Sequence, residues 1–162
     1  MLRGGGHLMT TQILVMRHAE KPDDPTDPDL TPAGQQRATT LATFIPKRFG
    51  TPDFIFAASI SKNSARPYET VKPLSKATGI PIDATYADQD YGALAQALRS
   101  ERRYQDKLII VCWHHGNIPN LLHALKALDG QYPDPWDRNV FNLILLTKFD
   151  GDTPATVTAV TY

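Results

Sequence analysis

Short apolar runs without polar alternation recur along the chain. Three of them span Gln12 to Met16, Phe54 to Ala58 and Leu108 to Trp113. Such runs are typical of strands that are covered on both faces, as in a parallel sheet. Two further runs, Leu143 to Phe149 and Thr156 to Tyr162, flank the turn sequence Asp-Gly-Asp and predict an antiparallel pair at the end of the chain.

Helical spacing of apolar residues follows each of the three buried strands. After the first strand, Thr31 caps an amphipathic segment that Pro46 is expected to end. After the second strand, Pro67 suits the first turn of a helix that stops at Gly79, and Pro73 should kink or shorten this helix. The helix after the third strand is predicted by an apolar stripe: Ile118, Leu121, Leu122 and Leu125.

Weaker patterns predict a short strand over Ile80 to Ala84 and a helix over Ala93 to Arg103. Strands that alternate with helices indicate an α/β protein with a mostly parallel central sheet covered on both faces. We expect a single domain over residues 9–162, and a disordered leader or an added remnant over residues 1–8. Ligands in such folds bind beyond the carboxyl ends of the strands.

Composition narrows the class of partner. Among 162 residues, 17 Lys and Arg balance 17 Asp and Glu, so no overall field draws the chain to nucleic acid or to an anionic membrane. No apolar stretch approaches the roughly 18 residues of a membrane span. The single cysteine, Cys112, lies in a buried run, which fits a reducing cytoplasm. We therefore expect a cytoplasmic protein, and no pattern indicates its oligomeric state.

Groups suited to phosphate chemistry stand at three strand-to-helix junctions. Arg17 and His18 end the first strand, Arg66 lies near the start of the second helix, and His114 and His115 follow the third strand. A neutral imidazole is a competent nucleophile near pH 7, and a guanidinium can hold a phosphate through two hydrogen bonds. The coincidence of three such junctions predicts that these side chains converge on one anion site.

No metal or cofactor is expected. Four aspartates lie between the first strand and the first helix: Asp23, Asp24, Asp27 and Asp29. Prolines and irregular spacing give them no defined ligand set, which favours a solvated loop. The adjacent histidines would point to opposite sides of an extended backbone.

Several of these segments resemble the histidine phosphatase superfamily, which includes the cofactor-dependent phosphoglycerate mutases. Arg17 to Glu20 resembles its Arg-His-Gly signature, and the stretch from Leu30 to Ala38 resembles its Leu-Thr-x-x-Gly segment. Arg66 with Thr70 resembles an Arg-x-x-x-Thr helix start, and the sequence His-Gly-Asn at 115–117 resembles the second histidine motif. The resemblance covers residues 13 to 128 and implies a three-layer α/β/α sandwich, phosphoglycerate mutase-like.

The resemblance implies a pocket of four residues: Arg17, His18, Arg66 and His115. The sequence departs from the family at Ala19, where glycine is usual, and at Ala58 to Ser61, which replaces a Ser-Ser-Pro segment. The His-Gly-Asn match favours His115 as the second histidine, whereas a register anchored on Ile118-Pro119 selects His114. Glu20, His114 and Asn117 are further candidates for substrate binding.

The mechanism that the resemblance implies begins with attack of His18 on phosphorus and ends with hydrolysis of the phosphohistidine by water. Arg17, Arg66 and His115 would hold the non-bridging oxygens. The leaving oxygen needs a proton donor. Asp88 lies four residues before a glycine, as in the acid segment of the family, and the alternatives are Asp90 and Glu20.

We expect a phosphatase that acts on a small phosphate ester or on a phosphoprotein. A first alternative is a mutase-type phosphotransferase, although mutases of the family commonly carry longer insertions around the pocket. A second alternative is a non-catalytic phosphate-binding module. Such a module would keep Arg17 and Arg66 but would need neither His18 nor an acid.

Overall fold

The computed structural model describes residues 10–162, so the predicted leader over residues 1–8 and the predicted domain start at residue 9 lie outside the described residues. The strands are β1 (Thr10–Arg17), β2 (Phe54–Ala57), β3 (Ile82–Asp83), β4 (Leu108–Trp113), β5 (Leu143–Asp150) and β6 (Thr156–Thr161). The α-helices are α1 (Pro32–Phe49), α2 (Arg66–Thr78), α3 (Tyr91–Ser100) and α4 (Ile118–Ala124). Three single-turn 3-10 helices cover Asp88–Asp90, Arg102–Tyr104 and His115–Asn117. None of the helices in this part of the chain is long and apolar enough to cross a membrane.

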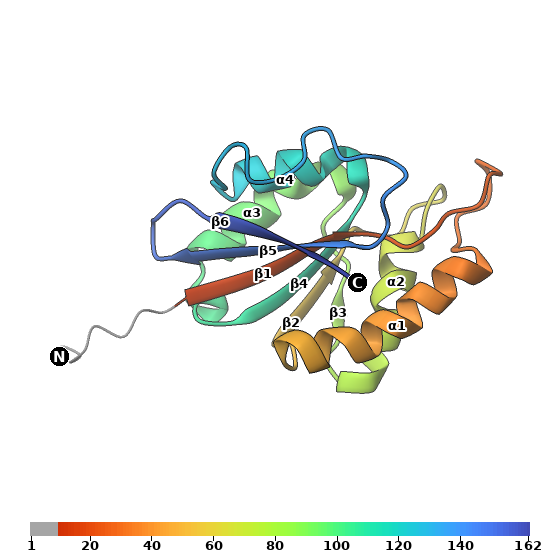
Figure 1. Ribbon diagram of the computed structural model, residues 1–162, viewed down its shortest axis with the longest axis horizontal. Helices are drawn as coiled ribbons and strands as arrows, with labels where there is room; N and C mark the ends of the chain where they lie inside the picture. The colour runs from red at the N-terminus through yellow and green to blue at the C-terminus, as the bar shows by residue number, and fades with distance from the viewer. Residues whose placement is uncertain (1–9) are drawn as a thin grey trace.

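The strands form one six-stranded sheet in the order β3-β2-β4-β1-β5-β6. The pairs β2–β3, β2–β4 and β1–β4 are parallel, whereas β1–β5 and β5–β6 are antiparallel. Helices α1 and α2 cover one face of this sheet, and α3 and α4 cover the other (Figure 1). The fold is therefore the expected three-layer α/β/α sandwich with a mostly parallel sheet.

The two cores on either side of the sheet explain why the strands lack polar alternation. Ile13 and Val15 of β1 belong to the core under α3 and α4. Leu14 and Met16 belong to the core under α1 and α2. Successive residues of a strand point to opposite faces, so a strand with helices on both sides must be apolar at every position.

Strand register brings the predicted site segments to one edge of the sheet. Arg17 of β1 is paired with Trp113 of β4, and the backbone N–H of His18 donates to the carbonyl of Trp113 at 3.1 Å. On the other side of β4, the N–H of Ala58 donates to the carbonyl of Cys112 at 3.1 Å. The residues that follow β1, β2 and β4 therefore meet beyond the carboxyl ends of these strands.

The helix boundaries follow most of the sequence signals, with one correction. Thr31 caps α1 by accepting a hydrogen bond from the N–H of Gly34, and Gly79 ends α2 in the left-handed conformation with φ 76°. The prediction that Pro46 ends α1 is wrong, because α1 continues to Phe49. A proline in the last turn removes one donor only, and the bond from the N–H of Gly50 to the carbonyl of Pro46 still closes that turn.

The observed bounds of α2, β3 and α3 can be compared with the predicted ones. Pro73 lies inside α2 and does not shorten it, since the helix keeps all 13 residues from Arg66 to Thr78. The weak strand pattern over Ile80 to Ala84 corresponds to the two residues of β3. The helix predicted over Ala93 to Arg103 is α3, which begins two residues earlier and ends at Ser100.

Candidate active site

His18 follows β1 and is 2% exposed. Its Nδ1 atom lies 2.7 Å from the carbonyl oxygen of Ala19. Because a carbonyl oxygen only accepts hydrogen bonds, Nδ1 carries the proton of the neutral ring and Nε2 carries the lone pair. Burial lowers the pKa of His18 to about 3, and the charges of the neighbouring His114, Arg17 and Arg66 act in the same direction. The imidazole is therefore uncharged over the whole neutral range.

The ring that contacts His18 belongs to His114. The two ring centroids are 5.3 Å apart and the rings meet edge to face, with an interplanar angle of 73°. Burial lowers the pKa of His114, and the nearby carboxylate of Asp88 opposes this shift. His115, which the motif match favoured, begins a 3-10 turn and lines a cavity together with Arg17. The structure thus brings His114, and not His115, beside the predicted nucleophile.

Two arginines lie close to His18. Arg17 is 2% exposed, its Nη1 donates to the carbonyl of Arg138, and its guanidinium lies 4.0 Å above the ring centre of Phe141. Burial and the charge of Arg66 lower the pKa of Arg17 to about 10. Arg66 begins α2, and its Nη1 donates to the carbonyl of Asp27 at 2.7 Å.

Each of these arginines keeps a buried donor without a protein partner. The Nε atoms of Arg17 and Arg66 have no hydrogen-bond acceptor within residues 10–162. A buried donor without a partner costs about 1–3 kcal/mol. A bound anion would satisfy both N–H groups and would also relieve the repulsion between the two guanidinium groups.

Thr70 joins the end of β1 to the start of α2. Its side chain is fully buried, its Oγ1 accepts a hydrogen bond from the N–H of Ala19 at 2.9 Å, and its hydroxyl donates to the carbonyl of Arg66 at 2.7 Å. A threonine four residues after Arg66 lies one helical turn away and can reach that carbonyl. This geometry explains why the threonine follows the arginine at a spacing of four residues.

Gly34 allows α1 to approach the segment that follows His18. A Cβ atom at this position would lie 2.6 Å from the carbonyl oxygen of Glu20 and 3.1 Å from the Cβ of Leu30. The N–H of Thr31 donates to the same Glu20 carbonyl at 3.1 Å. The glycine in the Leu-Thr-x-x-Gly segment is therefore required by close backbone contact.

Among the carboxyl groups proposed from the sequence, Asp88 lies beside His114. One of its oxygens, Oδ2, accepts from the side-chain amide of Asn117 at 2.8 Å, while Oδ1 is buried and has no partner in the described part of the chain. The indole N–H of Trp113 donates to the backbone carbonyl of Asp88 at 2.9 Å. Asn117, a candidate for substrate binding, therefore contacts Asp88 and fixes the orientation of its carboxylate.

The two alternative carboxyl groups are placed differently. Asp90 is exposed. Glu20 pairs with Arg37 of α1, whose Nε and Nη2 donate to both carboxylate oxygens at 2.9 to 3.0 Å. This ion pair holds the carboxylate of Glu20 against α1.

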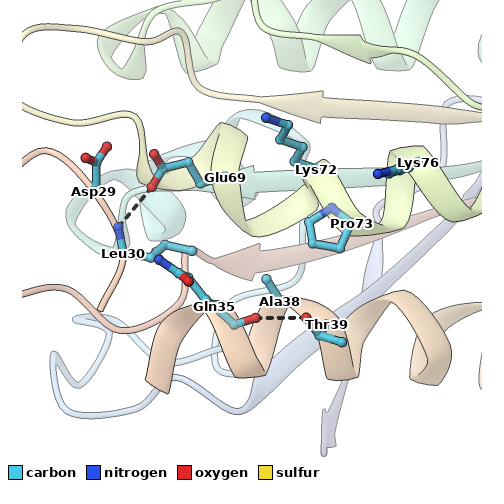
Figure 2. A pocket seen from close by; sticks show the side chains of 9 residues that line it. All are labelled: Asp29, Leu30, Gln35, Ala38, Thr39, Glu69, Lys72, Pro73 and Lys76. Carbon is cyan, nitrogen blue, oxygen red and sulfur yellow. Dashed lines mark hydrogen bonds between the residues drawn. The ribbon is translucent and has the colours of Figure 1, made fainter. Parts of the chain in front are cut away.

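Two cavities of similar volume are relevant to the position of the site. One, of about 510 Å³, lies between α1 and α2, and none of the candidate histidines and arginines lines it. Figure 2 shows Glu69, which lines this cavity, pointing toward the N–H of Leu30. The other, of about 490 Å³, is lined by Arg17 and His115. Within residues 10–162, no three His, Cys, Asp or Glu side chains gather closely enough to hold a metal ion.

Comparisons with known proteins support the fold. No family model matches the chain, and no curated protein matches it in sequence. Among solved structures, the protein histidine phosphatase SixA, in complex with tungstate, is 16% identical with a TM-score of 0.69, over 93% of this chain and 96% of that one. The mycobacterial glucosyl-3-phosphoglycerate phosphatase is 14% identical, with a TM-score of 0.64 over 94% and 98%. Phosphoglycerate mutase from Plasmodium falciparum is also 14% identical, with a TM-score of 0.64 over 93% and 89%. The chain therefore has the fold of the histidine phosphatase superfamily, as the sequence resemblance implied.

Proposed function

We propose that the protein is a phosphatase that hydrolyses a phosphate monoester through a phosphohistidine on His18. The observation that carries this proposal is the state of the His18 ring. It is buried and uncharged, and its Nδ1–H is engaged with the carbonyl of Ala19 at 2.7 Å. The lone pair on Nε2 is then the nucleophile, beside two guanidinium groups that attract phosphate.

The reaction proceeds in two displacements. In the first, the Nε2 lone pair of His18 forms a bond to phosphorus while the bond from phosphorus to the ester oxygen breaks, and the leaving oxygen takes up a proton. In the second, a water oxygen attacks phosphorus, the nitrogen–phosphorus bond breaks, and the electron pair returns to Nε2. Arg17, Arg66 and His114 hold the non-bridging oxygens during both steps, where positioning and charge stabilisation dominate catalysis.

Asp88 is the proposed proton donor. Its Oδ1 atom is buried and has no partner within the described residues, while Asn117 holds Oδ2. A carboxyl group arranged in this way can give its proton to the leaving oxygen and then take a proton from the attacking water. Such general acid–base catalysis contributes about 10² to 10⁴ in rate.

Trapping of the intermediate tests the proposal. The protein is incubated with 4-nitrophenyl phosphate at mildly acidic pH, quenched rapidly in alkali and digested for mass spectrometry. We expect one phosphate on His18 and no turnover by His18→Ala. His123→Ala is the matched control, because His123 is exposed on α4 and should be dispensable. Turnover by His18→Ala at the wild-type rate would overturn the proposal.

A further inference from the structure

Residues 137–142, which precede β5, hold Arg17 at two points. The carbonyl of Arg138 accepts a hydrogen bond from Nη1 of Arg17, and the ring centre of Phe141 lies 4.0 Å from the guanidinium carbon. Arg17 is only 2% exposed, so these protein contacts, and not solvent, set the position of its guanidinium. The position of Arg17 therefore depends on how this segment is itself held.

The segment contains no helix or strand, and hydrogen bonds from other residues fix its backbone. The indole N–H of Trp136 donates to the carbonyl of Val140 at 3.0 Å. The hydroxyl of Tyr162 donates to the carbonyl of Phe141 at 3.1 Å. The backbone N–H of Tyr162 donates to the next carbonyl, that of Asn142, also at 3.1 Å. Tyr162 thus anchors two consecutive peptide groups of the segment.

The ring of Tyr162 is held against α1. It stacks on the ring of Phe44, with the two centroids 5.4 Å apart and an interplanar angle of 29°. The guanidinium carbon of Arg37 lies 5.6 Å from the centre of the Tyr162 ring, and Arg37 also binds both carboxylate oxygens of Glu20. Tyr162 therefore joins two supports of the site, the segment before β5 and the helix α1.

The hydroxyl of Tyr162 is a constant hydrogen-bond donor. Burial raises the pKa of this phenol, and the charge of Arg37 opposes the shift only in part. Because the ordinary pKa of tyrosine is about 10, a raised pKa keeps the proton on the hydroxyl at every pH up to that value. The hydrogen bond to the carbonyl of Phe141 therefore persists throughout the neutral range.

We propose that Tyr162 positions Arg17 for phosphate by fixing the segment that holds its guanidinium. The inference rests on the proposed function, because it gives Arg17 the task of holding the non-bridging oxygens. Tyr162 is a positioning residue and not a catalytic one, since it reaches Arg17 only through Phe141 and the backbone around it. Without the hydroxyl the segment can shift, and Arg17 keeps its charge but moves relative to His18. Small displacements of groups that stabilise the transition state lower the rate.

Tyr162→Phe tests the proposal, because it removes the hydroxyl and keeps the ring that stacks on Phe44. We expect kcat/KM for 4-nitrophenyl phosphate to fall about tenfold. We expect the affinity for inorganic phosphate, measured by calorimetric titration, to fall about threefold. Tyr132→Phe is the matched control and should keep both values, because Tyr132 is half-buried before β5 and packs against the core under α3 and α4.

A double-mutant cycle separates positioning of Arg17 from a general structural role. Arg17→Lys keeps a positive charge but lacks the planar guanidinium that the segment holds. If Tyr162 acts through that guanidinium, Tyr162→Phe should cost less than twofold in kcat/KM when it is added to Arg17→Lys. A general structural role predicts the same tenfold loss in both backgrounds. Urea unfolding of each variant confirms that the assays compare folded proteins.

The outcomes separate this inference from the proposed function. Wild-type kcat/KM and phosphate affinity in Tyr162→Phe, or losses that add fully in Arg17→Lys, would overturn the inference while the phosphatase proposal stands. If the wild type binds phosphate but turns over no ester, the proposed function fails and the titrations decide the inference. Weaker binding by Tyr162→Phe would then support it, and equal binding would overturn it. If the wild type does not bind phosphate at all, both are wrong.

Discussion

Ala19 and Thr70, which are 51 residues apart in the sequence, are joined by a hydrogen bond of 2.9 Å from the backbone N–H of Ala19 to the Oγ1 of Thr70. Ala19 also offers the carbonyl that fixes the ring of His18, and Thr70 donates to the carbonyl of Arg66. One buried hydroxyl thus couples the segment of His18 to the arginine at the start of α2. Under the proposed function these two residues act on the same phosphate, so this coupling would fix their relative position.

Replacement of Thr70 by valine removes this hydroxyl and keeps the shape of the side chain. The N–H of Ala19 then loses its partner in a buried position, so we expect the free energy of unfolding to fall by about 1–3 kcal/mol. We also expect kcat to fall more than KM rises, because the nucleophile shifts relative to the bound phosphate. Urea unfolding and steady-state kinetics measure the two effects.

Thr70→Ser restores the hydroxyl and serves as the rescue control. Recovery of kcat in Thr70→Ser would attribute the loss to the hydrogen bonds of the side chain. A Thr70→Val protein with wild-type kcat would show that the hydroxyl does not position the site.

Gly34 supplies a second structural test, because a methyl group there would lie 2.6 Å from the carbonyl oxygen of Glu20. We expect Gly34→Ala to lower the free energy of unfolding by about 1–3 kcal/mol, since overpacking forces the backbone to shift. Gly92→Ala is the matched control, because Gly92 lies in α3 and its Cβ would meet no atom within 4 Å. Thermal unfolding of both variants should show a loss at position 34 alone, and equal Tm values would contradict the close-contact explanation.

The two adjacent histidines show where sequence analysis reaches its limit. The apolar runs, the caps and the parallel register follow from local patterns, and they place Arg17, His18 and Arg66 at one edge of the sheet. The choice between His114 and His115 depends on the 3-10 turn that begins at His115, and a turn of a few residues leaves no periodic signal.

Contacts between distant parts of the chain were also beyond sequence analysis. Arg138 reaches the site through a hydrogen bond with Arg17 across 121 positions, from a segment without periodicity. Glu20 was a candidate acid by proximity to His18, but its pairing with Arg37 depends on how α1 lies against the loop. Such contacts are fixed by tertiary packing, so neither spacing nor composition reveals them.

Single replacements of the two histidines compare their roles directly. His114 contacts the ring of His18, whereas His115 lines the neighbouring cavity. We expect His114→Ala to lower kcat for 4-nitrophenyl phosphate by about 10² or more, as expected when a donor to the non-bridging oxygens is removed. His115→Ala should change kcat much less. A larger loss in His115→Ala would reverse the assignment of the second histidine.

Stability should depend on pH through the buried neutral ring of His18. In the unfolded chain this histidine titrates near its ordinary pKa of about 6.5, whereas in the folded protein burial lowers its pKa to about 3. Between these values the unfolded chain binds one proton more than the folded chain. The contribution of His18 to stability is therefore fully present above pH 6.5 and is lost progressively as the pH falls toward 3.

We expect the free energy of unfolding of the wild type to fall by about 2 kcal/mol through this group between pH 7 and pH 5. His18→Gln cannot titrate and should lose less stability over the same interval. His123→Gln, which alters an exposed histidine, should follow the wild type. Urea unfolding at both pH values gives the comparison, and identical slopes for wild type and His18→Gln would contradict the burial of an uncharged ring.

The proton donor can be identified from the dependence of the rate on the leaving group. Asp88→Asn keeps the shape of the side chain but cannot donate a proton from a carboxyl group. An alkoxide leaves poorly without a proton, so we expect Asp88→Asn to lower kcat/KM for an alkyl phosphate by about 10² to 10⁴. 4-Nitrophenolate leaves readily as an anion, so hydrolysis of 4-nitrophenyl phosphate should fall much less.

Asp90→Asn, at an exposed neighbour, is the control and should affect neither substrate. An equal loss for both substrates in Asp88→Asn would show that Asp88 acts on the position of the site and not on the leaving oxygen, because only protonation of that oxygen makes the loss depend on the leaving group.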